Sequence, residues 1–125
     1  MDSIIEKAIE KIAHMPNDFH HLKNKSELTL LQESGYFELH DQIYEDEIIK
    51  ILKKDPNLIA EWLQWSDDSR SSSTWYFTRG DDGICFVGHW PDGKEFEKLI
   101  TSDEFKACAS FIKRQVESTR LLFNK

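Results

Sequence analysis

The chain has few of the residues that mark disulfide-bonded, fibrous or membrane-spanning proteins. Its 125 residues include two cysteines, three prolines and five glycines, so neither a disulfide framework nor a Pro/Gly-rich repeat explains its fold. No apolar run approaches the roughly 20 residues that cross a bilayer. The first residues lack the basic segment and apolar stretch of a secretory signal. We therefore expect a cytoplasmic protein with no membrane partner, in which Cys85 and Cys108 are reduced and internal.

The sequence also lacks the motifs of nucleotide binding and hydrolysis. It has no phosphate-binding loop, no dinucleotide fingerprint, no His-Glu-x-x-His and no Cys-x-x-Cys. Histidines are the remaining catalytic candidates, and a small hydrolase or a metal site would draw on His20, His21, His40 and Asp41. Adjacent side chains such as His20 and His21 diverge, which disfavours a shared metal. We expect no catalytic residue, no metal and no cofactor, and a protein that is not an enzyme.

Apolar residues recur at helical spacing through the first half of the chain. This spacing predicts helices over residues 3–14, 27–34, 42–54 and 57–65. Pro16 should end the first of them and Gly35 the second, with a loop over 17–25. Residues 28–31 would also serve as a strand, and residues 36–40 fit a helix or a strand equally well. Tyr44 belongs to the apolar stripe of the third predicted helix, together with Ile48, Ile51 and Leu52.

The second half of the chain changes from helical spacing to alternation. After a polar loop over 66–73, the pattern predicts three antiparallel strands, over residues 75–78, 84–87 and 95–100. The pair Thr101 and Glu104 fits a capping box at the start of a long last helix. The apolar stripe of that helix consists of Phe105, Cys108, Ala109, Ile112, Val116 and Phe123.

These elements predict a single α+β domain over residues 1–125. We expect a three-stranded antiparallel meander packed against the long C-terminal helix, with a helical N-terminal half. The chain is 39% hydrophobic and 12% aromatic, which is enough apolar material for one core at this length.

The charge of the chain is negative and unevenly placed. The net charge of −7 disfavours direct binding of nucleic acid. Neither Lys nor Arg occurs in residues 26–49, which we call the acidic window. The carboxylates of the window are Glu27, Glu33, Glu38, Asp41, Glu45, Asp46 and Glu47. Two interpretations are open: a solvated acidic face, or a surface that meets a basic partner.

Aromatic side chains accompany the acidic stretches. Tyr44 lies inside the acidic window, and Trp65 precedes two further carboxylates. Because Trp and Tyr are enriched where proteins meet, rings among carboxylates are what an inhibitor of a cationic site would present. The candidate partner-binding residues are Glu33, Glu38, Asp41, Tyr44, Glu45, Asp46, Glu47, Trp65, Asp67 and Asp68. The alternative contact region is the hairpin turn at Asp81 and Asp82, with Trp90.

Three segments of the second half carry a family resemblance. They read Ser-Thr-Trp-Tyr-Phe at 73–77, Gly-Ile-Cys-Phe-Val-Gly at 83–88 and Ala-Cys-Ala-Ser-Phe-Ile-Lys-Arg at 107–114. This pattern, an aromatic hairpin followed by a helix, resembles small bacterial immunity proteins, including the antidotes of contact-dependent growth inhibition and other polymorphic toxins. The resemblance covers residues 73–117 and transfers no toxin-binding position.

The resemblance implies a protein that binds its cognate toxin domain and blocks it. Such toxins are often nucleases with basic substrate clefts, which agrees with the acidic balance of this chain. The leading hypothesis is therefore an acidic immunity protein whose partner is the basic C-terminal domain of a toxin, a nuclease by expectation. The alternative is a non-catalytic adaptor or regulatory module that binds another protein through the same surface.

Overall fold

The computed structural model describes residues 3–21, 27–67, 75–89 and 96–123. The helices of the first half are α1 (Ser3–Ala13), α2 (Met15–His21), α3 (Glu27–Ser34), α4 (Tyr36–Leu39), α5 (Glu45–Lys54) and α6 (Asn57–Asp67), with a 3-10 turn, η1 (His40–Gln42), between α4 and α5. The second half contains β1 (Trp75–Arg79), β2 (Cys85–His89), β3 (Phe96–Thr101) and α7 (Glu104–Phe123). The strands form one antiparallel sheet in the order β1-β2-β3, so the α+β class and the meander are as expected.

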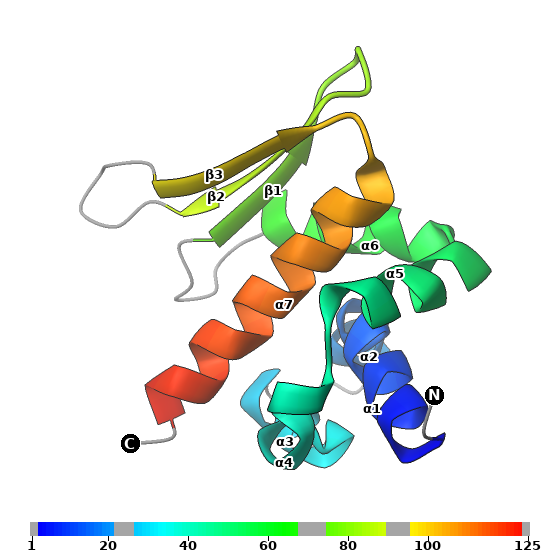
Figure 1. The fold of residues 1–125 in the computed structure, drawn as a ribbon, viewed down its shortest axis with the longest axis vertical. Helices are drawn as coiled ribbons and strands as arrows, with labels where there is room; N and C mark the ends of the chain where they lie inside the picture. The colour runs from blue at the N-terminus through cyan, green and yellow to red at the C-terminus, as the bar shows by residue number, and fades with distance from the viewer. Residues whose placement is uncertain (1–2, 22–26, 68–74, 90–95, 124–125) are drawn as a thin grey trace.

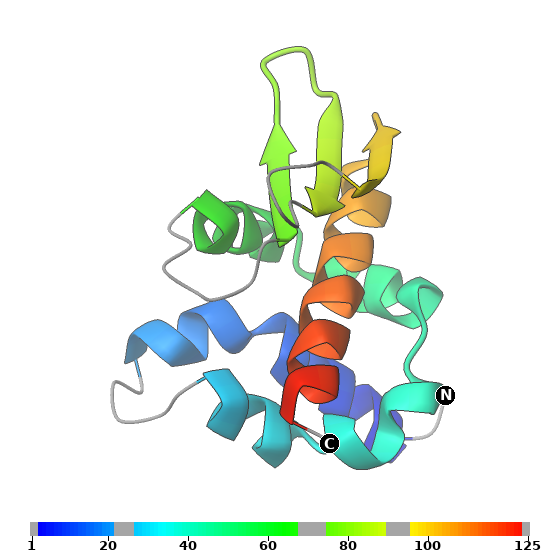
Figure 2. The same cartoon turned by 90° about the vertical axis from the view of Figure 1, so that its left-hand side faces the viewer.

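Helix α7 is the element that joins the two halves of the molecule. It packs against all three strands and also against α5 and α6. In Figure 1, α7 runs diagonally between the sheet and the helical N-terminal half, and Figure 2 shows the same separation from the side. No helix among the described residues is long and apolar enough to cross a membrane.

The central position of α7 explains why it buries more than one stripe. Cys108, Ala109, Ile112 and Val116 are buried as expected, and Phe105 is partly buried against the core. The helix also buries four positions outside the predicted stripe, Ala107, Ser110, Phe111 and Gln115. A helix with packed layers on two sides needs a wider buried surface than a helix that lies on the outside of a domain. The side chain of the last stripe residue, Phe123, lies outside the described part.

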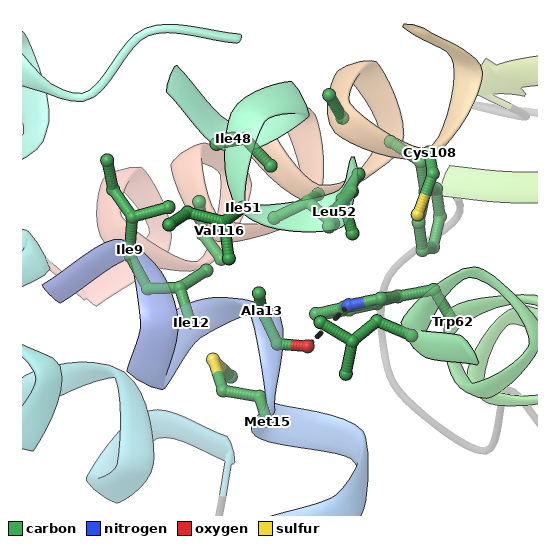
Figure 3. Packing of buried hydrophobic residues seen from close by; sticks show 14 of the residues in the cluster. Ile9, Ile12, Ala13, Met15, Ile48, Ile51, Leu52, Trp62, Cys108 and Val116 are labelled. Carbon is green, nitrogen blue, oxygen red and sulfur yellow. Dashed lines mark hydrogen bonds between the residues drawn. The ribbon is translucent and has the colours of Figure 1, made fainter. Parts of the chain in front are cut away.

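The core is one cluster of apolar side chains, which come from the helical first half of the chain and from the strands and α7 of the second half. Figure 3 shows Ile9 and Ile12 of α1, Ile51 of α5 and Val116 of α7 converging on one another. Aromatic rings extend the cluster toward the sheet, where Phe111 of α7 lies 5.7 Å from the ring of Phe77 in β1 and 6.0 Å from that of Trp62 in α6, centroid to centroid. A hydrogen bond adds to this link, because the backbone N–H of Phe77 donates to the buried hydroxyl of Ser66 at 2.7 Å.

The sheet presents different faces to α7 and to solvent. Phe77, Val87 and Leu99 stand opposite one another in the register and face the core. Alternation places Tyr76, Phe86 and Ile100 on the other face, where Ile100 is 56% exposed. Figure 1 shows α7 on one side of the sheet and no described helix on the other.

Several predicted boundaries in the first half are wrong. Pro16 does not open a loop, because it lies at the second position of α2, where its missing N–H costs no helical hydrogen bond. Residues 36–40 form α4 and the start of η1, so the strand alternative is excluded. The third predicted helix begins at Glu45 instead of residue 42, and Tyr44 is its exposed N-cap instead of part of the buried stripe.

The predicted capping box of the last helix is also wrong. Asp103 caps α7, since its Oδ1 accepts from the backbone N–H groups of Phe105 (3.1 Å) and Lys106 (3.2 Å). Thr101 Oγ1 instead accepts from the backbone N–H of Asp103 at 3.1 Å. Glu104 reaches a different partner, the guanidinium of Arg79 at 2.7 Å. The carboxylate of Asp103, which lies between the predicted pair, therefore caps the helix in their place.

Candidate docking surface

The acidic window folds into α3, α4, η1 and the first turn of α5. Its carboxylates divide by exposure: Glu33, Glu38, Asp41 and Asp46 are exposed, whereas Glu45 and Glu47 are half-buried. The side chain of Glu27 lies outside the described part. Four carboxylates of the window therefore face solvent and are available to a partner.

Tyr44 is the aromatic residue of this surface. It is 63% exposed, although tyrosine carries a large apolar ring. Its backbone is extended (φ −104°, ψ 156°), and its carbonyl oxygen accepts from the N–H groups of Glu47 (3.0 Å) and Ile48 (3.2 Å) at the start of α5. The backbone of Tyr44 is thus fixed by the helix that follows, while its side chain is exposed to solvent. Tyr36, the other tyrosine of the window, is fully buried and cannot meet a partner.

The first turn of α5 stabilises its own carboxylates. Glu45, Asp46 and Glu47 lie at the N-terminus of the helix, where the helix dipole favours negative charge. Glu47 also pairs with Lys50, at 3.7 Å from Nζ to Oε2. That oxygen is buried and accepts no hydrogen bond among the described residues. Asp46 is therefore the carboxylate of this turn that is most available to a partner.

Cations from α7 border the acidic window, which its sequence does not reveal. Burial holds the pKa of Lys113 below its usual value, although the nearby charges of Glu117, Glu45 and Asp41 act in the opposite direction. Asp41 also contributes to the raised pKa of Arg120, whose main cause is a hydrogen bond to Glu117. Lys113 is therefore within electrostatic reach of Asp41 and Glu45, and Arg120 is within reach of Asp41.

A cluster of four side chains, Tyr36, Lys113, Glu117 and Arg120, lies beneath this part of the window. We call it the Tyr36 cluster. The hydroxyl of Tyr36 donates to Glu117 Oε2, and the guanidinium of Arg120 donates to Glu117 Oε1, from Nε at 2.7 Å. Lys113 Nζ donates to the hydroxyl of Tyr36 at 3.0 Å and to the carbonyl oxygen of His40 at 2.7 Å. The same ammonium lies 4.9 Å from the centroid of the Tyr36 ring.

The protonation states of the Tyr36 cluster are fixed near neutral pH. Burial, together with the hydrogen bond to Glu117, raises the pKa of Tyr36 well above its ordinary value, so the phenol remains a donor. Burial alone would raise the pKa of Glu117, but hydrogen bonds from Arg120 and Tyr36 outweigh it and hold that pKa below its usual range. None of these groups is poised to exchange a proton at neutral pH, so the cluster connects α4 to α7 and does not resemble an acid–base pair.

The remaining candidate residues lie apart from this surface or outside the description. Trp65 is half-buried, with its ring 5.7 Å from that of Trp62 and packed against the core. Asp67 is the last residue of α6 but its side chain is not described, and Asp68 lies outside the described residues. The alternative contact region at the hairpin turn has exposed carboxylates at Asp81 and Asp82, whereas Trp90 lies outside the description.

The residues considered for catalysis and metal binding do not converge in the described part of the chain. His40 is half-buried, with its ring 6.3 Å from that of Tyr36, and the side chains of His20 and His21 are not described. Within the described ranges, no three His, Cys, Asp or Glu side chains are grouped so that they could hold a metal ion. Cys85 and Cys108 are free and buried, as expected, and burial raises the pKa of both thiols.

Comparison with known proteins adds no relative. A scan of protein families, a search of curated proteins and a search of solved structures each returned no match to this chain. The resemblance of residues 73–117 to immunity proteins therefore stands on the sequence pattern alone.

Proposed function

We propose that this protein is an immunity protein that binds the basic C-terminal domain of a cognate bacterial toxin, a nuclease, in the cytoplasm and blocks its active site. The observation that carries the proposal is the exposure of Tyr44, whose neighbours in the chain include the exposed carboxylates Asp41 and Asp46. Protein interfaces commonly combine an aromatic anchor with a polar rim. Asp41 and Asp46 supply such a rim on either side of Tyr44 in the chain.

The charge of the proposed partner follows from the charge of this surface. A nuclease holds the phosphates of its substrate with Lys and Arg, so its active site attracts an acidic protein. With a net charge of −7, the immunity protein would be drawn to such a cleft by long-range attraction, which speeds association. Glu33, Glu38, Asp41 and Asp46 are the exposed carboxylates of the window that would face such a cleft.

The test is co-expression with the C-terminal domain of a large secreted protein encoded beside this gene. We expect the full chain to restore growth and to co-purify with that domain. Asp46→Lys should slow association at least several-fold at low salt, and Tyr44→Ala should mainly speed dissociation. Glu10→Lys is the matched control, because it makes the same charge change at an exposed position of α1 outside the window.

The outcomes separate the proposal from its alternatives. If Asp46→Lys and Glu10→Lys slow association equally, only the net charge matters and the acidic window is not the contact surface. Asp82→Lys then tests the hairpin turn in the same assay. If the wild-type chain neither rescues growth nor co-purifies with the neighbouring toxin domain, the immunity function is wrong. Co-purification with a non-toxic host protein in its place would support the adaptor function.

A further inference from the structure

The segment that would carry the contact has little regular structure of its own. We call residues 36–46 the docking segment; it comprises α4, η1, two extended residues and the first residues of α5. Helix α4 has four residues, and its N-cap, Gly35, has no side chain, although the hydroxyl of Ser34 accepts from the backbone N–H of Tyr36 at 3.2 Å. An isolated helix of this length is unstable in water, because nucleation costs more than so few hydrogen bonds return. Something outside the segment must hold its shape.

Buried side chains hold the two ends of the segment. Tyr36 and Ile43 are almost fully buried, whereas Glu38, Asp41 and Tyr44 between and beside them are exposed. Burial of these two residues fixes where the segment starts and where it turns toward α5. Between them, Phe37 and Leu39 are also partly buried against the core. Apolar packing supplies no hydrogen bond to the backbone carbonyl groups at the end of α4, near His40.

Lys113 provides the missing contact at that point. His40 is the C-cap of α4, and carbonyl groups at a helix C-terminus have no partner within the helix. The ammonium of Lys113 donates to the His40 carbonyl at 2.7 Å and, at 3.0 Å, to the hydroxyl of Tyr36. A cation at this end of a helix is also favoured by the helix dipole. One side chain of α7 therefore connects both ends of α4.

We propose that Lys113 is the positioning residue of the docking segment: by bridging Tyr36 and the His40 carbonyl, it holds Tyr44 and the neighbouring carboxylates in their binding arrangement. The effect on toxin binding rests on the proposed function, whereas the claim that Lys113 holds the segment in place does not. A preorganised segment loses less conformational entropy when it binds, so its complex dissociates more slowly.

The proposal makes a prediction opposite in sign to simple electrostatics. Lys113 is a positive charge beside an acidic surface, so its removal makes that surface more negative. If only charge mattered, Lys113→Met would bind a basic partner faster and more tightly than the wild type does. If Lys113 positions the segment, Lys113→Met binds more weakly and dissociates faster, although the attraction has increased. Lys106→Met is the matched control, since Lys106 is an exposed lysine of the same helix.

The first measurement needs no partner. We expect the amide hydrogens of Glu38 and Leu39, which donate to the Gly35 carbonyl, to exchange at least about tenfold faster in Lys113→Met than in Lys106→Met, because a hydrogen bond to a charged group is lost. Tyr36→Phe keeps the ring and leaves Lys113 bonded to the His40 carbonyl. It should therefore show a smaller increase in exchange, and it guards against a misfolded Lys113 variant. Equal exchange in Lys113→Met and Lys106→Met overturns the proposal.

The second measurement uses the toxin domain that co-purifies with the wild-type chain in the test above. We expect Lys113→Met to raise Kd about tenfold relative to Lys106→Met through faster dissociation, with association unchanged or faster. Binding by Lys113→Met that is equal to or tighter than that of Lys106→Met overturns the proposal. If the wild type binds no toxin domain, the proposed function fails, and the exchange measurement still decides whether Lys113 holds the segment.

Discussion

Trp62 of α6 donates the hydrogen bond of its indole Nε1 to the carbonyl oxygen of Ala13, at 2.9 Å and across 49 positions of the chain. Ala13 is the last residue of α1, where backbone carbonyls lack a partner within the helix. Both residues are completely buried, and Figure 3 shows the bond at the centre of the apolar cluster. The Trp62 side chain thus fills space in the core and also donates to a buried carbonyl group at the end of a helix. Without that hydrogen bond, burial of the carbonyl would destabilise the fold.

Replacing Trp62 by Phe should separate these two contributions. Phenylalanine keeps an aromatic ring in the core but leaves the Ala13 carbonyl buried without its donor. We expect the free energy of unfolding to fall by about 2–4 kcal/mol, from the lost hydrogen bond and the volume that the smaller ring leaves empty. Urea unfolding followed by circular dichroism measures it. A loss below about 0.5 kcal/mol would mean that the carbonyl finds another donor or water.

A charge placed on the buried face of α7 should abolish folding. Ile112 is completely buried where the sheet and the helical half both pack on α7. Ile112→Asp would bury an unpaired carboxylate, and the loss should exceed what a domain of this size can tolerate. Leu121→Asp is the matched control on the same helix, since Leu121 is 57% exposed. We expect near-ultraviolet circular dichroism to vanish for the first variant only; a native-like spectrum for Ile112→Asp would contradict the packing.

The elements that sequence predicts well are those whose pattern is local. Strong periodicity located α1, α6 and α7, and aromatic alternation with a Gly-containing turn located the meander. Boundaries failed where residues compete for the same backbone groups. Asp103, and not Thr101, caps the N-terminus of α7. Pro16 lies inside α2 because the backbone N–H groups of the first helical turn have no partner within the helix, so its missing N–H costs nothing there.

The candidate surface was predictable in composition but not in its neighbours. The carboxylates and Tyr44 follow from the sequence of the acidic window alone. Lys113 and Arg120 do not, because they lie more than 60 positions later in the chain and reach the window only through the packing of α7. Their helical spacing with Glu117 on α7 is visible in the sequence, but nothing local indicates that Lys113 donates to a buried tyrosine.

The two thiols should resist modification in the folded protein. Cys85 and Cys108 are completely buried, and burial raises the pKa of both, so little of the reactive thiolate exists at neutral pH. We expect an aromatic disulfide reagent to label both rapidly only after denaturation in urea. Native labelling should be slower by orders of magnitude, because it requires opening of the core. Rapid labelling of either thiol in the native protein would show that β2 or α7 opens locally.

The Tyr36 cluster should make stability depend on pH in the acid range. Hydrogen bonds from Arg120 and Tyr36 hold the folded-state pKa of Glu117 below its usual value of about 4.3. Such a group contributes stability that is fully present above about pH 4.3 and is lost as pH falls through the lower folded-state pKa. Glu117→Gln removes this contribution. We expect the difference in unfolding free energy between wild type and Glu117→Gln to be constant above about pH 5.5 and to shrink below pH 4; a difference that does not change between pH 7 and pH 3 would contradict the assignment.

Charge reversals in the first turn of α5 should differ in stability as well as in binding. Sequence alone places Glu45, Asp46 and Glu47 on an exposed turn, where a triple reversal to Lys would leave stability almost unchanged. In the structure they face the positive end of the helix dipole, and Glu47 also pairs with Lys50. Each reversal should therefore cost about 0.3–1 kcal/mol from the dipole alone, with Glu47→Lys the most costly because its carboxylate is half-buried.

The comparison of single reversals tests this. Thermal unfolding at low salt should give Glu47→Lys a lower melting temperature than Asp46→Lys. Added salt should reduce this difference only in part, since one oxygen of Glu47 is buried and is screened less than an exposed charge. Equal melting of the two variants would mean that Glu47 is as exposed in solution as Asp46. Because Asp46 combines full exposure with the smallest expected loss of stability, a binding defect of Asp46→Lys that exceeds that of Glu10→Lys reports on the docking surface and not on folding.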